Sequence, residues 1–410
     1  METGFRKTTL ENGLRVLSET MTQTRSVSVG VWIRGGSRSD PPSCMGLTHF
    51  LEHMLFKGTL SRSAFEIATH LERLGGHLNA FTEKEFICLH ATVLDEFLPQ
   101  AVEILADLVR HARLDGTDFD TEKQVILEEI HALEDTPEEW IHELFLDAVI
   151  ASHPLGLPIL GTRDSLQGIS RDAMQTFREK SFTADHLLVS AAGNLRHETL
   201  TALVSRFFAD MSRGDPIETE PVRFGPAGTR THRSPINQSH FCLGGPGIAY
   251  SNPDKFPLIL LSTYLGGGMS SRLFQTVREK LGLAYSIYSF SETWSDSGIF
   301  GVYAGTSDER MPQALEAVEA ELDAVLRQGI PKPELDGLKS QLRGNLLLSH
   351  ENVHSRMGRI ARMETYTADY MPLDEVIGRI LRVGPDDIRR IAEALLNPSA
   401  RHLVALRSEE

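Results

Sequence analysis

A short segment of the chain occurs twice in similar form. The sequence DEFLPQAVE at Asp95–Glu103 recurs as DERMPQALE at Asp308–Glu316, an offset of 213 residues (308 minus 95). Because this offset is about half of the 410 residues, the two halves of the chain are predicted to be duplicated domains. Residues 212–231 are rich in proline, glycine and charged side chains, which is typical of a connecting segment. We therefore expect one domain at residues 1–212 and a second at residues 213–410.

Strand patterns and helix patterns are grouped along the chain and do not alternate strictly. The tight-turn sequence Asn12-Gly13 predicts a hairpin within residues 5–19. Further strands are expected at residues 26–33, 78–82, 85–93, 240–243, 284–291, 298–304 and 402–406. Helices are expected around residues 49–53 and at 63–74, 97–114, 118–133, 256–265, 270–280, 312–327 and 333–348. The grouping predicts an α+β fold with two duplicated domains, each a mainly antiparallel sheet packed with helices.

The helix around residues 49–53 carries the sequence H-x-x-E-H. Residues four apart lie on one face of a helix, so His49 and His53 point the same way and suit a divalent metal, most often zinc. Glu52 is close enough to that face to reach a metal-held water, and such a carboxylate is the general base of metal-assisted hydrolysis. This order of residues is typical of inverted zinc peptidases. The alternative is a set of buried, hydrogen-bonded side chains without a metal.

The helix expected at residues 118–133 supplies a third candidate ligand. Its apolar stripe includes Val125 and Ile126, and both Glu122 and Glu129 fall within that stripe. A carboxylate among apolar side chains either lacks a partner or coordinates something. Because a catalytic zinc normally takes three protein ligands and a water, Glu129 is the candidate for the third ligand.

Charge and composition exclude several classes of protein. The net charge of -15 argues against nucleic acid or an anionic membrane as the main partner, and it is compatible with cationic substrates. Cys44, Cys88 and Cys242 are odd in number and widely spaced, so no disulfide framework is expected. The apolar run Phe256–Leu261 is too short to span a membrane, and Met1–Lys7 lacks the apolar core of a secretory signal. A cytoplasmic protein is expected.

Taken together, these residues resemble the pitrilysin and mitochondrial-processing-peptidase family of zinc metallopeptidases. The resemblance rests first on His49–His53 followed by Glu129 76 residues after His53 (129 minus 53). It extends through Gly75–Thr82, His153–Thr162, Gly266–Phe274 and Arg278–Ser286. The length resembles the short, two-domain, processing-peptidase-like branch.

The resemblance implies a zinc-dependent metalloendopeptidase with one Zn²⁺ per chain. His49, His53 and Glu129 are then the metal ligands, and Glu52 is the general base. Glu122 matches an auxiliary carboxylate near the site, and an ordinary solvated or paired Glu is the alternative. The second half has no H-x-x-E-H, so only the first domain is expected to bind metal. Family members enclose extended peptides or unstructured segments in a chamber made by two chains or two halves. A homodimer, or a heterodimer with a related subunit, is therefore expected, and the competing function is that of a non-catalytic partner subunit.

Further residues are assigned to substrate binding by the same resemblance. Asn79, Ala80 and Phe81 match an exposed edge strand that takes an extended peptide by strand addition, although an ordinary paired strand is the alternative. Phe56 is expected either in the pocket after the scissile bond or in the core.

Two more pairs of residues are candidates for substrate contact. Arg278 and Tyr285 match a substrate-contacting pair in which Tyr donates a hydrogen bond to the developing oxyanion, and their alternative is a surface Arg and a strand Tyr. Glu139 and Glu143 follow Glu129 by ten and fourteen residues, where processing peptidases that prefer Arg near the cut carry acidic residues. Spaced i and i+4 on a helix, they can hold a guanidinium jointly or form a solvated acidic face.

Overall fold

The computed structural model describes residues 4–409, so the first three residues of the N-terminal stretch considered above lie outside it. The chain forms two compact units. Unit 1 contains Met1–His131, Pro158–Thr219 and Leu348–Tyr370. Unit 2 contains Ala132–Leu157, Glu220–Leu347 and Met371–Glu410. Each unit therefore includes one segment from the other half of the sequence.

Unit 1 is built on a six-stranded sheet with the order β1-β2-β6-β3-β5-β4. Its strands are β1 (Phe5–Thr9), β2 (Arg15–Thr20), β3 (Ser26–Arg34), β4 (His77–Thr82), β5 (Phe86–Leu94) and β6 (Leu187–Gly193). All neighbours are antiparallel except β2 and β6. The hairpin expected within residues 5–19 is confirmed, since β1 and β2 pair with Phe5 opposite Glu19 and Gly13 turns with a φ of 93°.

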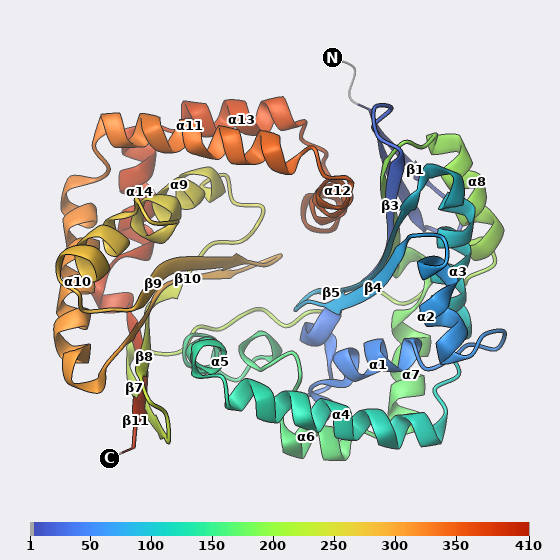
Figure 1. Ribbon diagram of the computed structural model, residues 1–410, viewed down its shortest axis with the longest axis horizontal. Coiled ribbons are helices and arrows are strands. Elements are labelled where there is room, and N and C mark those ends of the chain that lie inside the picture. The colour runs from blue at the N-terminus through green and yellow to red at the C-terminus, as the bar shows by residue number, and fades with distance from the viewer. Residues whose placement is uncertain (1–3, 410) are drawn as a thin grey trace. The chain divides into compact units, whose positions relative to one another are not determined.

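Helices cover both faces of this sheet (Figure 1). One face packs on α1 (Leu47–Leu55), α2 (Ala64–Glu72), α3 (Leu98–His111) and α8 (His197–Phe208). The other face packs on α12 (Val353–Thr367), from the second half of the sequence. Strand β3 shows why two layers are needed: Val29 and Val31 enter the first core, whereas Trp32 enters the second beside Met357 of α12. The remaining helices associated with unit 1 are α4 (Gly116–Glu134), α6 (Arg163–Gly168) and α7 (Arg171–Ser181).

Unit 2 repeats the same topology with five strands. They are β7 (Gly228–Ser234), β8 (Ser239–Pro246), β9 (Ser286–Thr293), β10 (Gly298–Thr306) and β11 (His402–Ser408). Their order, β7-β11-β8-β10-β9, equals that of unit 1 without β1, and the parallel pair β7–β11 corresponds to β2–β6. The two copies of the repeated segment lead into equivalent helices, α3 and α10 (Met311–Gln328). The duplicated α+β fold is thus confirmed.

The sheet of unit 2 also has helices on both faces. The helix α5 (Pro137–Val149), from the first half of the sequence, packs on one face through Ile141 and Phe145. The other face packs on α9 (Lys255–Gly266), α10 and α14 (Pro385–Leu395). The further helices are α11 (Lys332–Ser349) and α13 (Leu373–Arg382). The two halves therefore exchange equivalent helices, α5 and α12.

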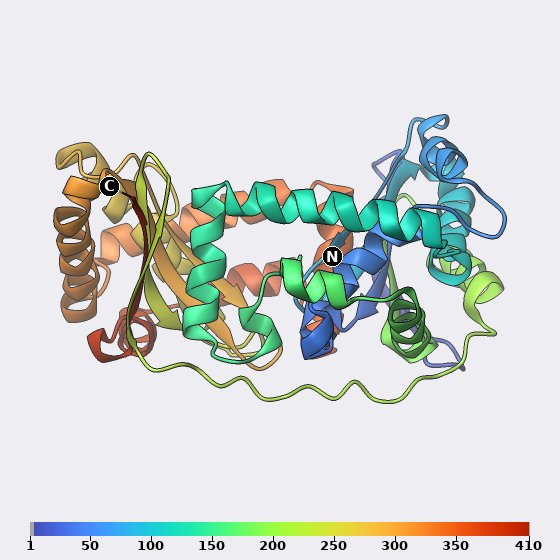
Figure 2. The same cartoon turned by 90° about the horizontal axis from the view of Figure 1, so that it is seen from below.

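Two local features complete the fold. The helix expected at residues 270–280 is a π-helix over Phe274–Lys280, in which the Leu281 N–H donates to the Thr276 carbonyl five residues earlier. The segment before β7 is extended, as expected for a connection, and contains only an isolated bridge at Phe224 (yellow-green in Figure 2). Within residues 4–409, no helix is long and apolar enough to cross a membrane.

Candidate active site

The start of α1 is fixed by a buried carboxylate. Asp40 accepts hydrogen bonds from the backbone N–H groups of Gly46 (2.9 Å) and Thr48 (3.0 Å), which are unsatisfied donors at a helix N-terminus. Burial nevertheless raises the pKa of Asp40 to about 7. Gly46 has a φ of 91°, and a Cβ there would lie 2.4 Å from the carbonyl oxygen of Leu160, so this position requires glycine. These contacts set the position of the helix that carries the H-x-x-E-H residues.

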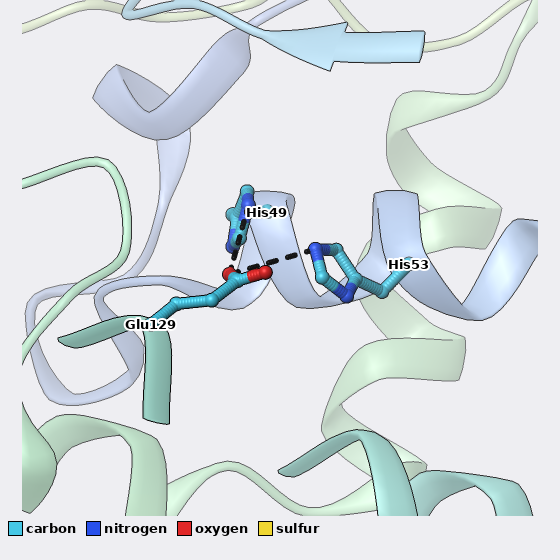
Figure 3. A group of neighbouring side chains, drawn as sticks. All are labelled: His49, His53 and Glu129. Atoms are coloured by element: carbon cyan, nitrogen blue, oxygen red, sulfur yellow. Dashed lines mark ion pairs between the residues drawn. The ribbon is translucent and has the colours of Figure 1, made fainter. Parts of the chain in front are cut away.

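His49, Glu129 and His53 lie together (Figure 3). His49 Nε2 lies 3.8 Å and His53 Nε2 lies 3.7 Å from the same oxygen of Glu129, Oε2. These separations are too long for hydrogen bonds. Two ligand atoms on one tetrahedral zinc ion lie roughly 3.4 Å apart, given metal–ligand distances of about 2.1 Å. The three side chains therefore fit around a zinc ion, and this is the one such group within residues 4–409.

The protonation of His49 and the contacts of His53 also fit metal binding. Burial, followed by the neighbouring His53, lowers the pKa of His49 to about 3, so His49 is neutral at physiological pH. His53 Nδ1 lies 3.1 Å from Oε2 of Glu122, which leaves Nε2 of His53 facing Glu129. The other oxygen of Glu122 pairs with Lys57 Nζ at 2.6 Å. Glu122 thus contacts His53 and lies outside the group of three candidate ligands, an arrangement that suits a positioning role for Glu122.

Truncating Glu122 tests this positioning role. We expect Glu122→Ala to lower zinc affinity by about tenfold to a hundredfold, because the ring of His53 loses the partner that fixes its orientation. Competition with a chromogenic chelator measures the affinity. Glu128→Ala, an exposed position on the same helix, serves as the control and should leave affinity unchanged. Equal affinities of Glu122→Ala and the wild type would contradict the role.

Glu52 is on α1 and lies beside the three candidate ligands. Its Oε2 accepts a hydrogen bond of 2.5 Å from the hydroxyl of Thr82 on β4, and burial raises the pKa of its carboxyl. Thr82 had no role in the sequence analysis, although it ends an expected strand. Its contact with Glu52 joins residues 30 positions apart, and no sequence spacing indicates such a contact.

Strand β4 is an edge strand, as its place at the end of the sheet order requires. Asn79 is exposed, and its side-chain oxygen accepts from the N–H of Ala80 at 2.9 Å. Ala80 packs against the core beneath α1. Phe81 lies on the opposite face, 5.8 Å from the ring of Trp32. Both faces of β4 are therefore packed, and its open edge is what remains available beside Glu52.

A pocket of about 380 Å³ adjoins these residues and lies within unit 1. Phe56, the residue that follows α1, lines the pocket together with Glu52 and His53 and also packs against the core. Phe56 thus packs against the core and also lines a pocket, while its expected place after the scissile bond stays a prediction. The other lining residues are Lys57, Ala68, Glu72, His77, Leu78, Asn79 and Glu122.

The remaining candidates lie in unit 2. Arg278, on the π-helix, stacks over the rings of Phe274 (4.6 Å) and Tyr285 (5.5 Å), so the predicted Arg/Tyr pair is in contact. Tyr285 is 72% exposed. Glu139 and Glu143 are on α5, the first exposed and the second half-buried.

One part of the argument from periodicity was wrong. Val125, assigned to the apolar stripe of α4, is 40% exposed, whereas Ile126 and Ile130 are buried. The side chain of Glu129 is itself 40% exposed, and that of Glu122 is the buried one. Glu129 therefore lies at the margin of the buried stripe, where a ligand facing an accessible site belongs.

Two histidines and one carboxylate, with a second carboxylate beside them, are side-chain types that metal-dependent hydrolases use. Comparison with known families makes the class specific. The family model described as insulinase (peptidase family M16) matches residues 15–163, and that described as peptidase M16 inactive domain matches residues 168–342. The chain belongs to peptidase family M16, the insulinase family of zinc proteases.

Individual relatives agree with this assignment. A protein named uncharacterized zinc protease from Streptomyces coelicolor is 39% identical over 400 residues, covering 95% of this chain and 87% of the relative. The zinc protease YmxG of Bacillus subtilis, also named uncharacterized, is 38% identical over 391 residues and 95% of each chain. The crystal structure of a protease from Helicobacter pylori matches with a TM-score of 0.92, 22% identity and 99% of each chain. That likeness shows the shared fold.

Proposed function

We propose that the chain is a zinc-dependent endopeptidase that hydrolyses extended peptides or unstructured segments. The observation that carries the proposal is the group His49, His53 and Glu129, whose ligand atoms lie within 4.8 Å of one another beside Glu52. The two imidazoles and the carboxylate would hold zinc. When bound, zinc supplies a Lewis acid that polarises the scissile carbonyl and lowers the pKa of a water.

The chain's own residues perform the proton transfer. Glu52 accepts a proton from the attacking water and delivers it to the nitrogen of the leaving amine. The hydroxyl of Thr82 holds one oxygen of Glu52, which leaves the other oxygen for this exchange. Burial favours the protonated form of Glu52, which is the form that must donate to the amine in the second step.

Strand β4 supplies a means of holding the substrate. An extended peptide added to its open edge gains backbone hydrogen bonds, which do not depend on the side chains of the peptide. Asn79, Ala80 and Phe81 would contact such a peptide, and Phe56 would contact the side chain that enters the adjoining pocket. This mode of binding supports a preference for unfolded segments, because a folded protein rarely offers a free strand.

Residues of unit 2 complete the proposal. Arg278 and Tyr285 would contact the substrate, with the Tyr285 hydroxyl donating to the developing oxyanion, and the exposure of Tyr285 supports this role. Glu139 and Glu143 would bind an Arg near the cut, which product mapping of Glu139→Gln with Glu143→Gln on basic peptides tests. We further infer a homodimer in which the two chains share their sites, as family resemblance implies.

The alternative function is that of a non-catalytic partner subunit, and a chelator experiment distinguishes the two. The purified chain should cleave members of a quenched fluorescent peptide mixture, and a zinc chelator should lower the rate by at least about a hundredfold. Adding back Zn²⁺, but not Mg²⁺, should restore the rate. A chain that cleaves nothing when loaded with zinc, or that cleaves equally well with the chelator present, would contradict the proposal.

A further inference from the structure

The guanidinium of Arg278 is held by aromatic rings and donates no hydrogen bond within residues 4–409. Its Cζ atom lies 4.6 Å from the centre of the Phe274 ring and 5.5 Å from the centre of the Tyr285 ring. The carboxylate of Glu279 lies 3.8 Å from Nε of Arg278, which is too long for a hydrogen bond. Contacts with two rings therefore take the place that a paired carboxylate has at most arginines.

Ring stacking leaves the donors of Arg278 free, whereas ion pairing would occupy them. A guanidinium stacks through its flat face, and its N–H groups point outward in its plane. Arg272, in the same segment, shows the other arrangement, because its Nε and Nη2 atoms donate to one oxygen of Glu321 at 3.0 and 2.7 Å. Arg278 is thus oriented while its donors remain available for an oxygen of a peptide.

The ring of Phe274 is not part of the core of unit 2. Phe274 is half-buried and begins the π-helix. The flanking Leu273 and Val277 are fully buried and belong to that core. Among the described residues, Phe274 is neither in the core of unit 2 nor one of the side chains that pack against it. The contact with Arg278 is therefore what sets Phe274 apart from its apolar neighbours.

The second ring in contact with Arg278, that of Tyr285, is on a backbone that β10 fixes. The N–H of Tyr285 donates to the carbonyl of Gly305 at 2.9 Å. Just before it, the carbonyl of Gly282 accepts from Nη1 of Arg310 at 2.9 Å. The side chain of Tyr285 is nevertheless 72% exposed, so it shields only part of the guanidinium. Phe274 supplies the closer of the two ring contacts.

We propose that Phe274 is a positioning residue for Arg278, and that its ring holds the guanidinium beside Tyr285 with the N–H donors free for the substrate. This inference rests on the proposed contact between Arg278 and the substrate, and it adds the residue that preorganises that contact. A side chain that is already held in its binding orientation loses less conformational freedom when the substrate binds. Removal of the ring should therefore weaken substrate use without affecting the zinc ligands.

Replacement of Phe274 tests this role. Phe274→Leu keeps an apolar side chain but removes the ring, and we expect kcat/KM on a cleaved peptide to fall about threefold to tenfold, as for loss of a partly exposed cation–π contact. Phe274→Tyr retains a ring and should keep the wild-type kcat/KM. Phe224→Leu, at a partly exposed position of unit 2 away from Arg278, is the control and should also match the wild type. Zinc content and the thermal unfolding temperature should be unchanged in all three variants, because neither position is in a core.

A double-mutant cycle separates positioning from a merely structural role. In an Arg278→Ala background, assayed at higher enzyme concentration, Phe274→Leu should cause no further loss, because the ring then has no guanidinium to hold. If Arg278→Ala is impaired, three results overturn this inference alone: equal losses in both backgrounds, wild-type kcat/KM for Phe274→Leu, or an equal loss in Phe274→Tyr. Wild-type activity of Arg278→Ala overturns the proposed substrate contact and this inference together.

Discussion

Glu52→Gln is expected to lower kcat/KM by about a thousandfold or more while leaving zinc binding intact. The amide cannot accept the proton of the attacking water, so the step that generates the nucleophile is lost. Zinc is retained because Glu52 is not among the three residues whose ligand atoms lie together. The Gln side chain can still accept the hydrogen bond from Thr82, so the local structure should persist.

Activity and zinc content should be measured on the same samples. His49→Ala and Glu129→Gln serve as the matched comparisons, because each removes a ligand and should lose zinc and activity together. Glu128→Gln, exposed on α4, should change neither quantity. Loss of zinc from Glu52→Gln would contradict the division of roles between base and ligands, and so would substantial remaining activity.

Mixing two inactive variants is expected to restore activity. In the shared-site homodimer, the residues facing each zinc site come from the partner chain. Glu52→Gln lacks the base, and the double variant Arg278→Ala with Tyr285→Phe lacks the substrate contacts. When the two are co-refolded in equal amounts, half of the dimers are mixed and each carries one intact site. About a quarter of wild-type activity is therefore expected (one half times one half).

The controls for this experiment decide between models. Each variant refolded alone should remain nearly inactive, and light scattering should report dimers in every sample. Dimers that recover no activity on mixing would show that Arg278 and Tyr285 act within their own chain, and a double variant that is active alone would show that they have no catalytic part. A monomeric wild type with full activity would also contradict the shared-site model.

The sequence predicted most of the described strands and half of the described α-helices, because their signals are local. Asn12-Gly13 requires a tight turn, and Gly13 indeed has a φ of 93°. The i, i+4 spacing of His49 and His53 predicts a shared helix face, and both imidazoles lie near one oxygen of Glu129. These features depend on the geometry of a few neighbouring residues, which the spacing of residues in the sequence determines.

Contacts that depend on packing were not predictable in the same way. The apolar stripe of α12 indicates that one face is buried, but not that Met357 packs against Trp32 of the first half's sheet. The same holds for α5 and its Phe145. The periodicity of apolar residues also does not predict the exposure of each side chain, since Val125 belongs to the apolar pattern of α4 and yet faces solvent.

Long-range contacts within the site could not be predicted from the sequence for a related reason. The hydroxyl of Thr82 reaches Glu52 only because β4 lies beside α1. Glu72 joins the same pocket only because α2 ends there. Neither residue type is unusual at its position in the sequence. Only the packing of α1, α2 and β4 brings these side chains to one place.

The metal assignment is tested most directly by anomalous diffraction at the zinc absorption edge, on crystals grown with zinc. One strong peak per chain is predicted, about 2.0–2.2 Å from Nε2 of His49, Nε2 of His53 and a carboxylate oxygen of Glu129. Crystals of Glu129→Gln should show a weak peak or none at that position. A zinc peak elsewhere in the chain, or no peak between these three side chains in the wild type, would contradict the account.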